Sequence, residues 1–234
     1  MDSTLVIIPT FNEAENIADL LSALTRLYPA IHVLVVDDGS PDGTAARVKD
    51  VMKTDPRVFL LERSGKGGRG SAVLAGFRYG LQRDYKFFVE MDADFSHRPE
   101  EITEMFVQIG TVDMVVGSRY LPGSEIHQWG IKRTVFSYLA NAFARAMLGI
   151  PISDYTNGFR CYTRKAIESL SMDRIDAKGY VVLSEVAMQL HRRGLKIGEV
   201  PTVFVNRRRG ISNLTWGEIR EAFKSIVRIR REKN

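Results

Sequence analysis

Short apolar runs alternate with segments of helical periodicity along the first half of the chain. Nearly every position in these runs is apolar, as expected for strands buried on both faces of a parallel sheet. The runs cover residues 5–8, 33–36, 58–61, 87–91 and 114–117, and the helical segments between them include 17–27, 44–52 and 71–81. The sequence therefore predicts an α/β fold with a mostly parallel central sheet flanked by helices.

The pattern changes after Tyr120, where residues 121–130 contain a proline, two glycines and a tryptophan. Helices are predicted over 132–148 and after Gly179, and a strand over 202–205. No repeat and no flexible linker divides the chain, so residues 1–234 are expected to form a single domain with halves at 1–120 and 121–234.

Two helices carry local start signals. Asn12 and Glu15 have the spacing of a capping box, with Asn in place of Ser or Thr, and predict the start of the first helix. Thr215 and Glu218 have the same spacing before the last helix. That helix has an apolar face and a basic end, so it is expected either to pack on the core or to contact a membrane surface.

The chain has 234 residues, a formal net charge of +5 and one cysteine. A positive charge favours a partner that carries phosphate, and the absence of any recognisable nucleic-acid-binding module argues against nucleic acid. Cys161 is predicted to be a core residue. Without a signal peptide or a run of about 20 apolar residues, the chain is expected to be cytoplasmic with no transmembrane segment.

Two acidic motifs directly follow predicted strands, where ligands of open α/β sheets bind. Asp92 and Asp94 are two residues apart, so an extended backbone points both side chains to one side. They are candidate ligands of a hard divalent cation, which prefers a few carboxylates together with phosphate oxygens and water. Asp37 and Asp38 can bind a ribose hydroxyl or a base edge, and an ordinary polar turn is the alternative.

Residues 65–70 match the G-x-G-x-x-G pattern between a strand and a helix, and Glu90 lies near the offset of a ribose-binding acid. A dinucleotide-binding oxidoreductase is therefore an alternative. The motif follows the third strand instead of the first, and Glu90 lies inside a strand, which disfavours this interpretation. Lys66 and Arg69 are otherwise suited to lie beside a phosphate at a helix N-terminus.

Taken together, four motifs resemble the inverting GT-A glycosyltransferases of family 2. They are residues 9–13 (PTFNE), 36–40 (VDDGS), 92–94 (DAD) and 117–120 (GSRY). Within that family the resemblance is greatest to the polyprenol (dolichol) phosphate mannose synthases, and it covers nearly the whole chain. It rests on residues 92–97, Trp129 with Arg133, residues 157–160, and Arg207 with Gly210 and Ser212.

The resemblance implies a GT-A fold with a nucleotide-sugar-binding half over 1–120 and an acceptor-binding half over 121–234. It implies transfer of mannose from GDP-mannose to a polyprenyl or dolichyl phosphate, with Mg²⁺ or Mn²⁺ as cofactor and peripheral contact with a membrane. Asp94 and Ser96 would hold the metal, and the catalytic set would be Asp94, Arg119 and Arg133. The nucleotide-sugar-binding residues implied are Pro9, Phe11, Glu13, Val36, Asp38, Asp92, Ala93, Arg119, Arg207 and Asn213.

Three positions depart from the family pattern. Phe11 stands where Tyr is common, Asn213 where Lys is common, and Gly68-Arg69-Gly70 where the glycine turn is usually more apolar. The change at Asn213 removes one cation from the diphosphate site. The alternative functions are therefore a family 2 transferase that uses another nucleotide sugar, such as UDP-glucose, or a non-lipid acceptor.

Overall fold

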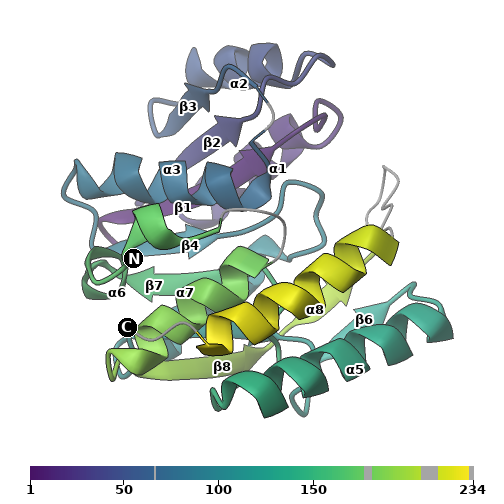
Figure 1. The fold of residues 1–234 in the computed structure, drawn as a ribbon. Helices are drawn as coiled ribbons and strands as arrows, with labels where there is room; N and C mark the ends of the chain where they lie inside the picture. The colour runs from purple at the N-terminus through teal and green to yellow at the C-terminus, as the bar shows by residue number, and fades with distance from the viewer. Residues whose placement is uncertain (66, 177–180, 207–215, 232–234) are drawn as a thin grey trace.

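The computed structural model describes residues 1–65, 67–176, 181–206 and 216–231, and one large sheet lies at its centre. The sheet has seven strands in the order β3-β2-β1-β4-β7-β5-β8 (Figure 1). All neighbours pair in parallel except β7, which is antiparallel to both β4 and β5. The strands are β1 (Thr4–Thr10), β2 (Ile31–Asp37), β3 (Val58–Glu62), β4 (Phe87–Glu90), β5 (Met114–Ser118), β7 (Arg160–Thr163) and β8 (Ile197–Pro201). The predicted α/β fold with a mostly parallel central sheet is confirmed.

Helices cover both faces of the sheet, and the alternation of side chains along the strands explains why. In β1, Leu5 and Ile7 belong to one buried cluster, whereas Val6 and Ile8 belong to a second cluster on the opposite face. The second cluster is covered by α1 (Ile17–Leu27), α2 (Thr44–Met52) and α4 (Ile102–Ile109). The first is covered by α3 (Arg69–Leu81), α5 (Ile131–Leu148), α6 (Arg164–Glu168), α7 (Val181–Arg192) and α8 (Trp216–Arg231).

Strands from both halves of the chain contribute to the central sheet, because β7 and β8 come after residue 120. A separate two-stranded sheet pairs β6 (Glu125–His127) with β9 (Val203–Val205) in parallel. It lies next to the start of α5 (Figure 1). Two short 3₁₀ helices, η1 (Pro99–Glu101) and η2 (Met172–Arg174), complete the described elements.

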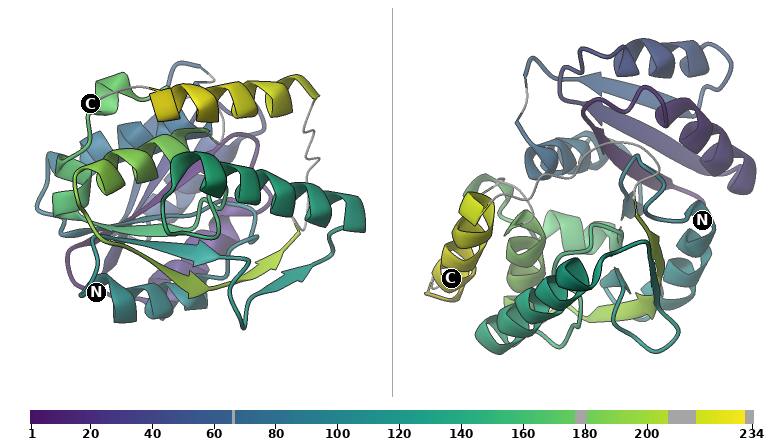
Figure 2. Two further views of the ribbon diagram at one scale, coloured as in Figure 1. Left: turned by 60° about the horizontal axis from the view of Figure 1, so that its bottom comes forward. Right: turned by 90° about the vertical axis from the view of Figure 1, so that its right-hand side faces the viewer.

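The last helix packs on the protein. Figure 2 shows α8 alongside α7 and α5, and Ile229 of α8 is buried in the core cluster. Arg228 forms ion pairs of 2.9 Å with both Asp176 and Glu185, and Arg192 donates to the Ile229 carbonyl. Of the two roles expected for this helix, packing on the core is therefore the one found over residues 224–231.

The opposite situation is found on α5, whose outer face is apolar and exposed. Ile131, Val135, Tyr138 and Leu139 are 83%, 51%, 62% and 59% exposed. Their spacing of four, seven and eight residues places them on one side of the helix. Within the described ranges, no helix is both long and apolar enough to cross a membrane.

The first helix covers the predicted range 17–27, but the capping box predicted at Asn12 and Glu15 does not form its start. Asn12 has a φ of 62°, and α1 begins only at Ile17 with Asn16 as its N-cap. Glu13, not Glu15, accepts a hydrogen bond from the Asn16 side chain. The backbone N–H groups of residues 12–14 donate to the side chains of Ser40 and Asp42 in the loop after β2 and of Thr44 at the start of α2. A long-range contact between two loops thus replaces the local cap.

Candidate active site

The carboxylates after β2 hold neighbouring strands and turns together. Asp37 accepts hydrogen bonds from the Thr10 hydroxyl (2.8 Å) and the Ser40 N–H (2.9 Å). Asp38 is nearly buried and accepts hydrogen bonds from Arg63 (2.7 Å) and from the backbone N–H of Gly68 (2.8 Å). These contacts fix the ends of β1 and β2 against the turn that precedes α3.

Near this corner lie Pro9, Phe11, Glu13 and Val36, which the sequence also assigned to nucleotide binding. Phe11 is 36% exposed, and Pro9 and Glu13 are half-buried. Val36 has no exposed surface and packs in the core, so the structure offers none of its surface to a nucleotide. Ala93 is likewise buried at 3% exposure.

The acidic triplet forms a tight turn directly after β4. The Asp94 carboxylate accepts the Ser96 N–H at 3.0 Å, and both residues are buried. Phe95, between them, has a φ of 59°. Asp92 is more accessible, with 24% of its side chain exposed. The turn therefore presents Asp92 outward and holds Asp94 inward beside Ser96.

His97 connects the acidic turn to the end of β5. Its Nδ1 accepts the Asp92 N–H at 3.1 Å, so its Nε2 carries the proton and donates to Asn157 Oδ1 at 2.8 Å. The Asn157 amide donates in turn to the Gly117 carbonyl at 2.6 Å. The imidazole stacks on Phe159 with ring centroids 5.0 Å apart. The sequence noted these residues as part of a resemblance but gave them no role.

Arg69 is the first residue of α3, the helix N-terminus at which the sequence placed it. Its guanidinium forms ion pairs with Glu90 (2.5 Å) and Asp92 (2.8 Å), which the sequence did not predict. Glu90 is buried, and its other oxygen accepts the Tyr162 hydroxyl at 3.1 Å. Glu90 is thus engaged inside the protein and does not present a carboxylate to a ribose, contrary to the dinucleotide-binding alternative.

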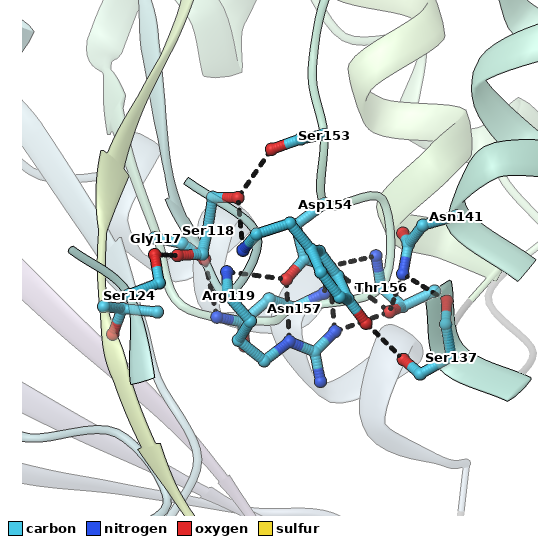
Figure 3. Close-up of polar contacts among 12 residues, drawn as sticks. Gly117, Ser118, Arg119, Ser124, Ser137, Asn141, Ser153, Asp154, Thr156 and Asn157 are labelled. Atoms are coloured by element: carbon cyan, nitrogen blue, oxygen red, sulfur yellow. Dashed lines mark hydrogen bonds and ion pairs between the residues drawn. The ribbon is translucent and has the colours of Figure 1, made fainter. Parts of the chain in front are cut away.

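A basic cluster follows β5 and is centred on Arg119 (Figure 3). The Arg119 guanidinium forms a two-point ion pair with the fully buried Asp154, at 2.7 and 2.8 Å, and donates to the Thr156 hydroxyl at 2.7 Å. Burial by itself raises the pKa of Asp154, but the charge of Arg119 and the hydrogen bonds from Arg119 and Thr156 hold that pKa below its ordinary value. Asp154 therefore stays ionised and fixes the arginine in one orientation.

Trp129 joins Arg119 to the second predicted arginine, Arg133. The guanidinium carbons of Arg119 and Arg133 lie 5.2 and 4.3 Å from the centre of a Trp129 ring. Contact with a π face stabilises a cation, so one indole supports two positive groups in the same corner. Arg133 also donates to Asn206 at 3.0 Å. Among the described residues, the buried Trp129 Nε1 has no hydrogen-bond partner.

The loop that carries Asp154 is fixed by Glu199 of β8. The Glu199 carboxylate accepts the backbone N–H groups of Ser153 and Asp154 at 2.8 and 3.1 Å. The Ser153 hydroxyl also bonds to Ser118, at the end of β5 (Figure 3). Asp154 and Glu199 were not found from the sequence, because ion pairs and loop contacts between distant residues leave no local pattern.

The two clusters contain all the residues that the sequence assigned to metal binding and to catalysis. Asp92, Asp94 and Ser96 lie after β4, and Arg119 and Arg133 lie around Trp129. The predicted residues Lys66, Arg207 and Asn213 and the start signal at Thr215 lie outside the described residues. Cys161 is buried in β7, and burial raises the pKa of its thiol, so its predicted place in the core is confirmed.

Residues 5–171 match the family model described as Glycosyl transferase family 2. The chain belongs to this family. The match spans both clusters through Arg133 and Asp154, and it excludes the dinucleotide-binding oxidoreductase as the family of this chain. The predicted catalytic class, a glycosyltransferase, is thereby confirmed.

Two curated relatives of this family 2 glycosyltransferase align over nearly its whole length. It is 42% identical to polyprenol monophosphomannose synthase of Mycolicibacterium smegmatis, over 96% of this chain and 85% of that protein. It is 40% identical to undecaprenyl-phosphate mannosyltransferase of Micrococcus luteus, over 96% and 92% of the two chains.

Solved structures show that the fold is GT-A. Glucosyl-3-phosphoglycerate synthase of Mycobacterium tuberculosis, crystallised with Mn²⁺, UDP-glucose and phosphoglyceric acid, superposes with a TM-score of 0.71. The two proteins are 18% identical, and the alignment covers 99% of this chain and 80% of the other. A complex of the same enzyme with Mn²⁺, UDP and glucosyl-3-phosphoglycerate superposes with a TM-score of 0.68, and the alignment covers 97% of this chain and 77% of the other.

Proposed function

We propose that this family 2 glycosyltransferase transfers mannose from GDP-mannose to a polyprenyl phosphate. The observation that carries the proposal is the pairing of an acidic turn after β4 with the Arg119–Trp129–Arg133 cluster at the end of β5, on the same edge of the sheet. The names of the two relatives at 40–42% identity support mannose as the sugar and a polyprenyl phosphate as the acceptor.

A phosphate acceptor explains why the basic cluster suits the chemistry. A phosphate monoester has a second pKa of about 6 and is largely deprotonated at neutral pH, so its oxygen attacks without a strong general base. The phosphate oxygen forms a bond to the anomeric carbon while the bond from that carbon to the GDP oxygen breaks, with inversion. The protein must then bring two anionic substrates together and neutralise them, which is the work proposed for Arg119 and Arg133.

Asp94 and Ser96 are the proposed metal ligands, and their donor atoms fit a divalent cation. Carboxylate and hydroxyl oxygens are the ligands that Mg²⁺ and Mn²⁺ prefer, and these two residues lie on one hydrogen-bonded turn. Such an ion, when bound, supplies positive charge against the donor diphosphate. Asp92, on the exposed side of the turn, is proposed to meet the donor, with Phe11, Glu13 and Asp38 towards the nucleotide.

The lipid acceptor requires contact with a membrane, and we propose that α5 makes it. The helix exposes its apolar face and its sequence contains no acidic residue, while Arg133 and Arg145 are basic. An anionic phospholipid surface complements that combination of apolar and positive groups. Because α5 begins next to Trp129, a polyprenyl chain in the membrane would end near the basic cluster. This contact would place the chain peripherally on a membrane, and its cytosolic face is the side proposed.

Incubation with labelled GDP-mannose, Mg²⁺ or Mn²⁺ and a polyprenyl phosphate tests the substrates. Label is expected to pass into the organic phase only when lipid phosphate and metal are both present. Parallel reactions with UDP-glucose and with a water-soluble phosphate acceptor test the two alternatives. Transfer from UDP-glucose, or to the soluble acceptor only, would overturn the proposed pair of substrates.

Flotation with vesicles that contain an anionic phospholipid tests the membrane contact. The double substitution Val135→Glu/Leu139→Glu is expected to abolish flotation, because it places two negative charges on the apolar face of α5. Val107→Glu is the matched control, since Val107 is an apolar residue of α4 that is 75% exposed. Equal flotation of all three proteins would show that α5 does not face the membrane.

A further inference from the structure

The side chain of Arg69, at the start of α3, contacts two other segments of the site. Its Nε donates to Asp92 at 2.8 Å, its Nη1 to Glu90 at 2.5 Å and its Nη2 to the Gly158 carbonyl at 3.2 Å. These partners belong to the turn after β4, to β4 itself and to the segment before β7. Every nitrogen of the guanidinium thus has a partner, and its plane is fixed.

The anchor of this arrangement is Glu90, which is 1% exposed. Its second oxygen accepts the Tyr162 hydroxyl, and in the pairing of β4 with β7 it lies opposite Arg160. Arg160 is fully buried, and its guanidinium donates to three backbone carbonyls. Positive and negative groups therefore alternate from the core to the surface, in the order Arg160, Glu90, Arg69 and Asp92.

The backbone around Arg69 is also shaped for this contact. Gly68 precedes it with a φ of 84°, a conformation that favours glycine, and its N–H is held by Asp38. On the opposite side, a Cβ on Gly158 would overlap the Arg69 guanidinium. The turn before α3 and the segment before β7 thus leave the guanidinium one place to lie, against the Asp92 carboxylate.

We propose that Arg69 is a positioning residue of the transferase site, which fixes the Asp92 carboxylate in the orientation that receives the donor and its metal ion. The inference rests on the proposed function, in which Asp92 meets the nucleotide sugar. The ion pair with Arg69 orders the Asp92 carboxylate, which is 24% exposed, before the donor binds. Binding then requires less ordering, and the affinity for metal and nucleotide rises.

The first test measures the binding of Mn²⁺ in the presence of GDP. The electron paramagnetic resonance signal of the free ion reports how much Mn²⁺ is unbound. Arg69→Met is expected to weaken Mn²⁺–GDP binding by about 10- to 100-fold, the range typical of removing a hydrogen-bond partner that orients a side chain at a metal site. Arg69→Lys keeps the positive charge but loses the planar guanidinium with its several donors. Its affinity for Mn²⁺–GDP is expected to lie between that of the wild type and that of Arg69→Met. Arg78→Met is the matched control, because Arg78 lies on the same helix in an exposed ion pair with Asp173.

A second pair of variants distinguishes two roles of Arg69, the positioning of the Asp92 carboxylate and the neutralisation of the buried Glu90. Arg69→Met alone removes the ion-pair partner of the buried Glu90, so the melting temperature is expected to fall. Arg69→Met/Glu90→Gln removes that charge and is expected to recover the melting temperature but not Mn²⁺–GDP binding. Binding restored to the wild-type level in this double variant would overturn the proposal and leave Arg69 a structural counterion.

Gly158→Ala provides a third variant, which displaces the Arg69 guanidinium without removing it. It is expected to weaken Mn²⁺–GDP binding as Arg69→Met does, and to add nothing when combined with it. If the losses of Mn²⁺–GDP affinity in the two single variants add up in the double variant, Gly158→Ala does not act through the position of the Arg69 guanidinium. The wild-type protein separates this inference from the proposed function. If it binds Mn²⁺ with GDP or UDP but makes no lipid-linked mannose, the proposed substrates are refuted, and the same variants still test the role of Arg69 in Mn²⁺–nucleotide binding. Failure to bind Mn²⁺ with either nucleotide would refute both.

Discussion

The acidic and basic clusters of the site are fixed in different ways. Asp92 lies at the surface and is held by a side chain, Arg69, that reaches it from another element. Arg119 is buried, and its partner Asp154 is buried completely. In the basic cluster, charge and fold stability therefore depend on each other, whereas the exposed part of the acidic cluster can be changed with less effect on stability.

The largest effect is expected at Arg119. Arg119→Ala alone would leave Asp154 as a buried unpaired charge, at a cost of about 3–5 kcal/mol in folding free energy. The informative variant is therefore Arg119→Met/Asp154→Asn, in which the fold is retained and transfer falls by about 100- to 1000-fold. Transfer assays, GDP binding and thermal unfolding measure the three quantities. Equal losses of GDP binding and transfer would assign Arg119 to the donor.

The next largest effect is expected from Asp94→Asn. The substitution keeps the shape of the side chain and removes its charge. The apparent affinity of the enzyme for Mg²⁺ or Mn²⁺ should therefore fall by about 10- to 100-fold. Titration of activity with each metal measures this change. If the metal dependence of the variant matches that of the wild type, Asp94 is not a ligand, and the acidic cluster serves another purpose.

A smaller effect is expected from Arg133→Met. Arg133 is exposed, and its side chain contacts Trp129 and Asn206 at the surface, so its replacement should leave the fold intact. Loss of one charge-assisted hydrogen bond to the acceptor phosphate is expected to raise the KM for the lipid by about tenfold. Arg47→Met, an exposed position on α2 at the opposite face of the sheet, is the control. A raised KM for GDP-mannose instead would move Arg133 to the donor side.

The smallest effect is expected at Glu185, which lies in neither cluster and gives a baseline for both. Burial raises the pKa of Glu185 to about 7, against the lowering effect of the Asp176 N–H and of Arg228. The folded state thus holds this proton more tightly than the unfolded chain does, and stability should fall as pH rises from about 4.5 to about 7. Melting temperatures of wild type and Glu185→Gln across this range test it, and a parallel pH dependence in both proteins would contradict the assignment.

The strands and the acidic turn could be predicted because consecutive apolar residues and a D-x-D motif at a strand end are local patterns. β7 was not predicted, since four residues that include a buried arginine do not read as a strand. Arg69 was assigned to a phosphate because its partners, Glu90 and Asp92, are more than 20 residues away. Likewise, α5 and α8 both have one apolar side, and only the tertiary packing decides which of the two is covered.

The antiparallel strand β7 has a consequence for how such a site can change over time. It separates the ends of β4 and β5 by two strand spacings, or about 10 Å. This gap is set by backbone hydrogen bonds, which do not depend on side-chain identity. The loops after β4 and β5 can therefore be replaced by loops that bind a different sugar or acceptor, while the distance between the proposed donor and acceptor sites stays constant.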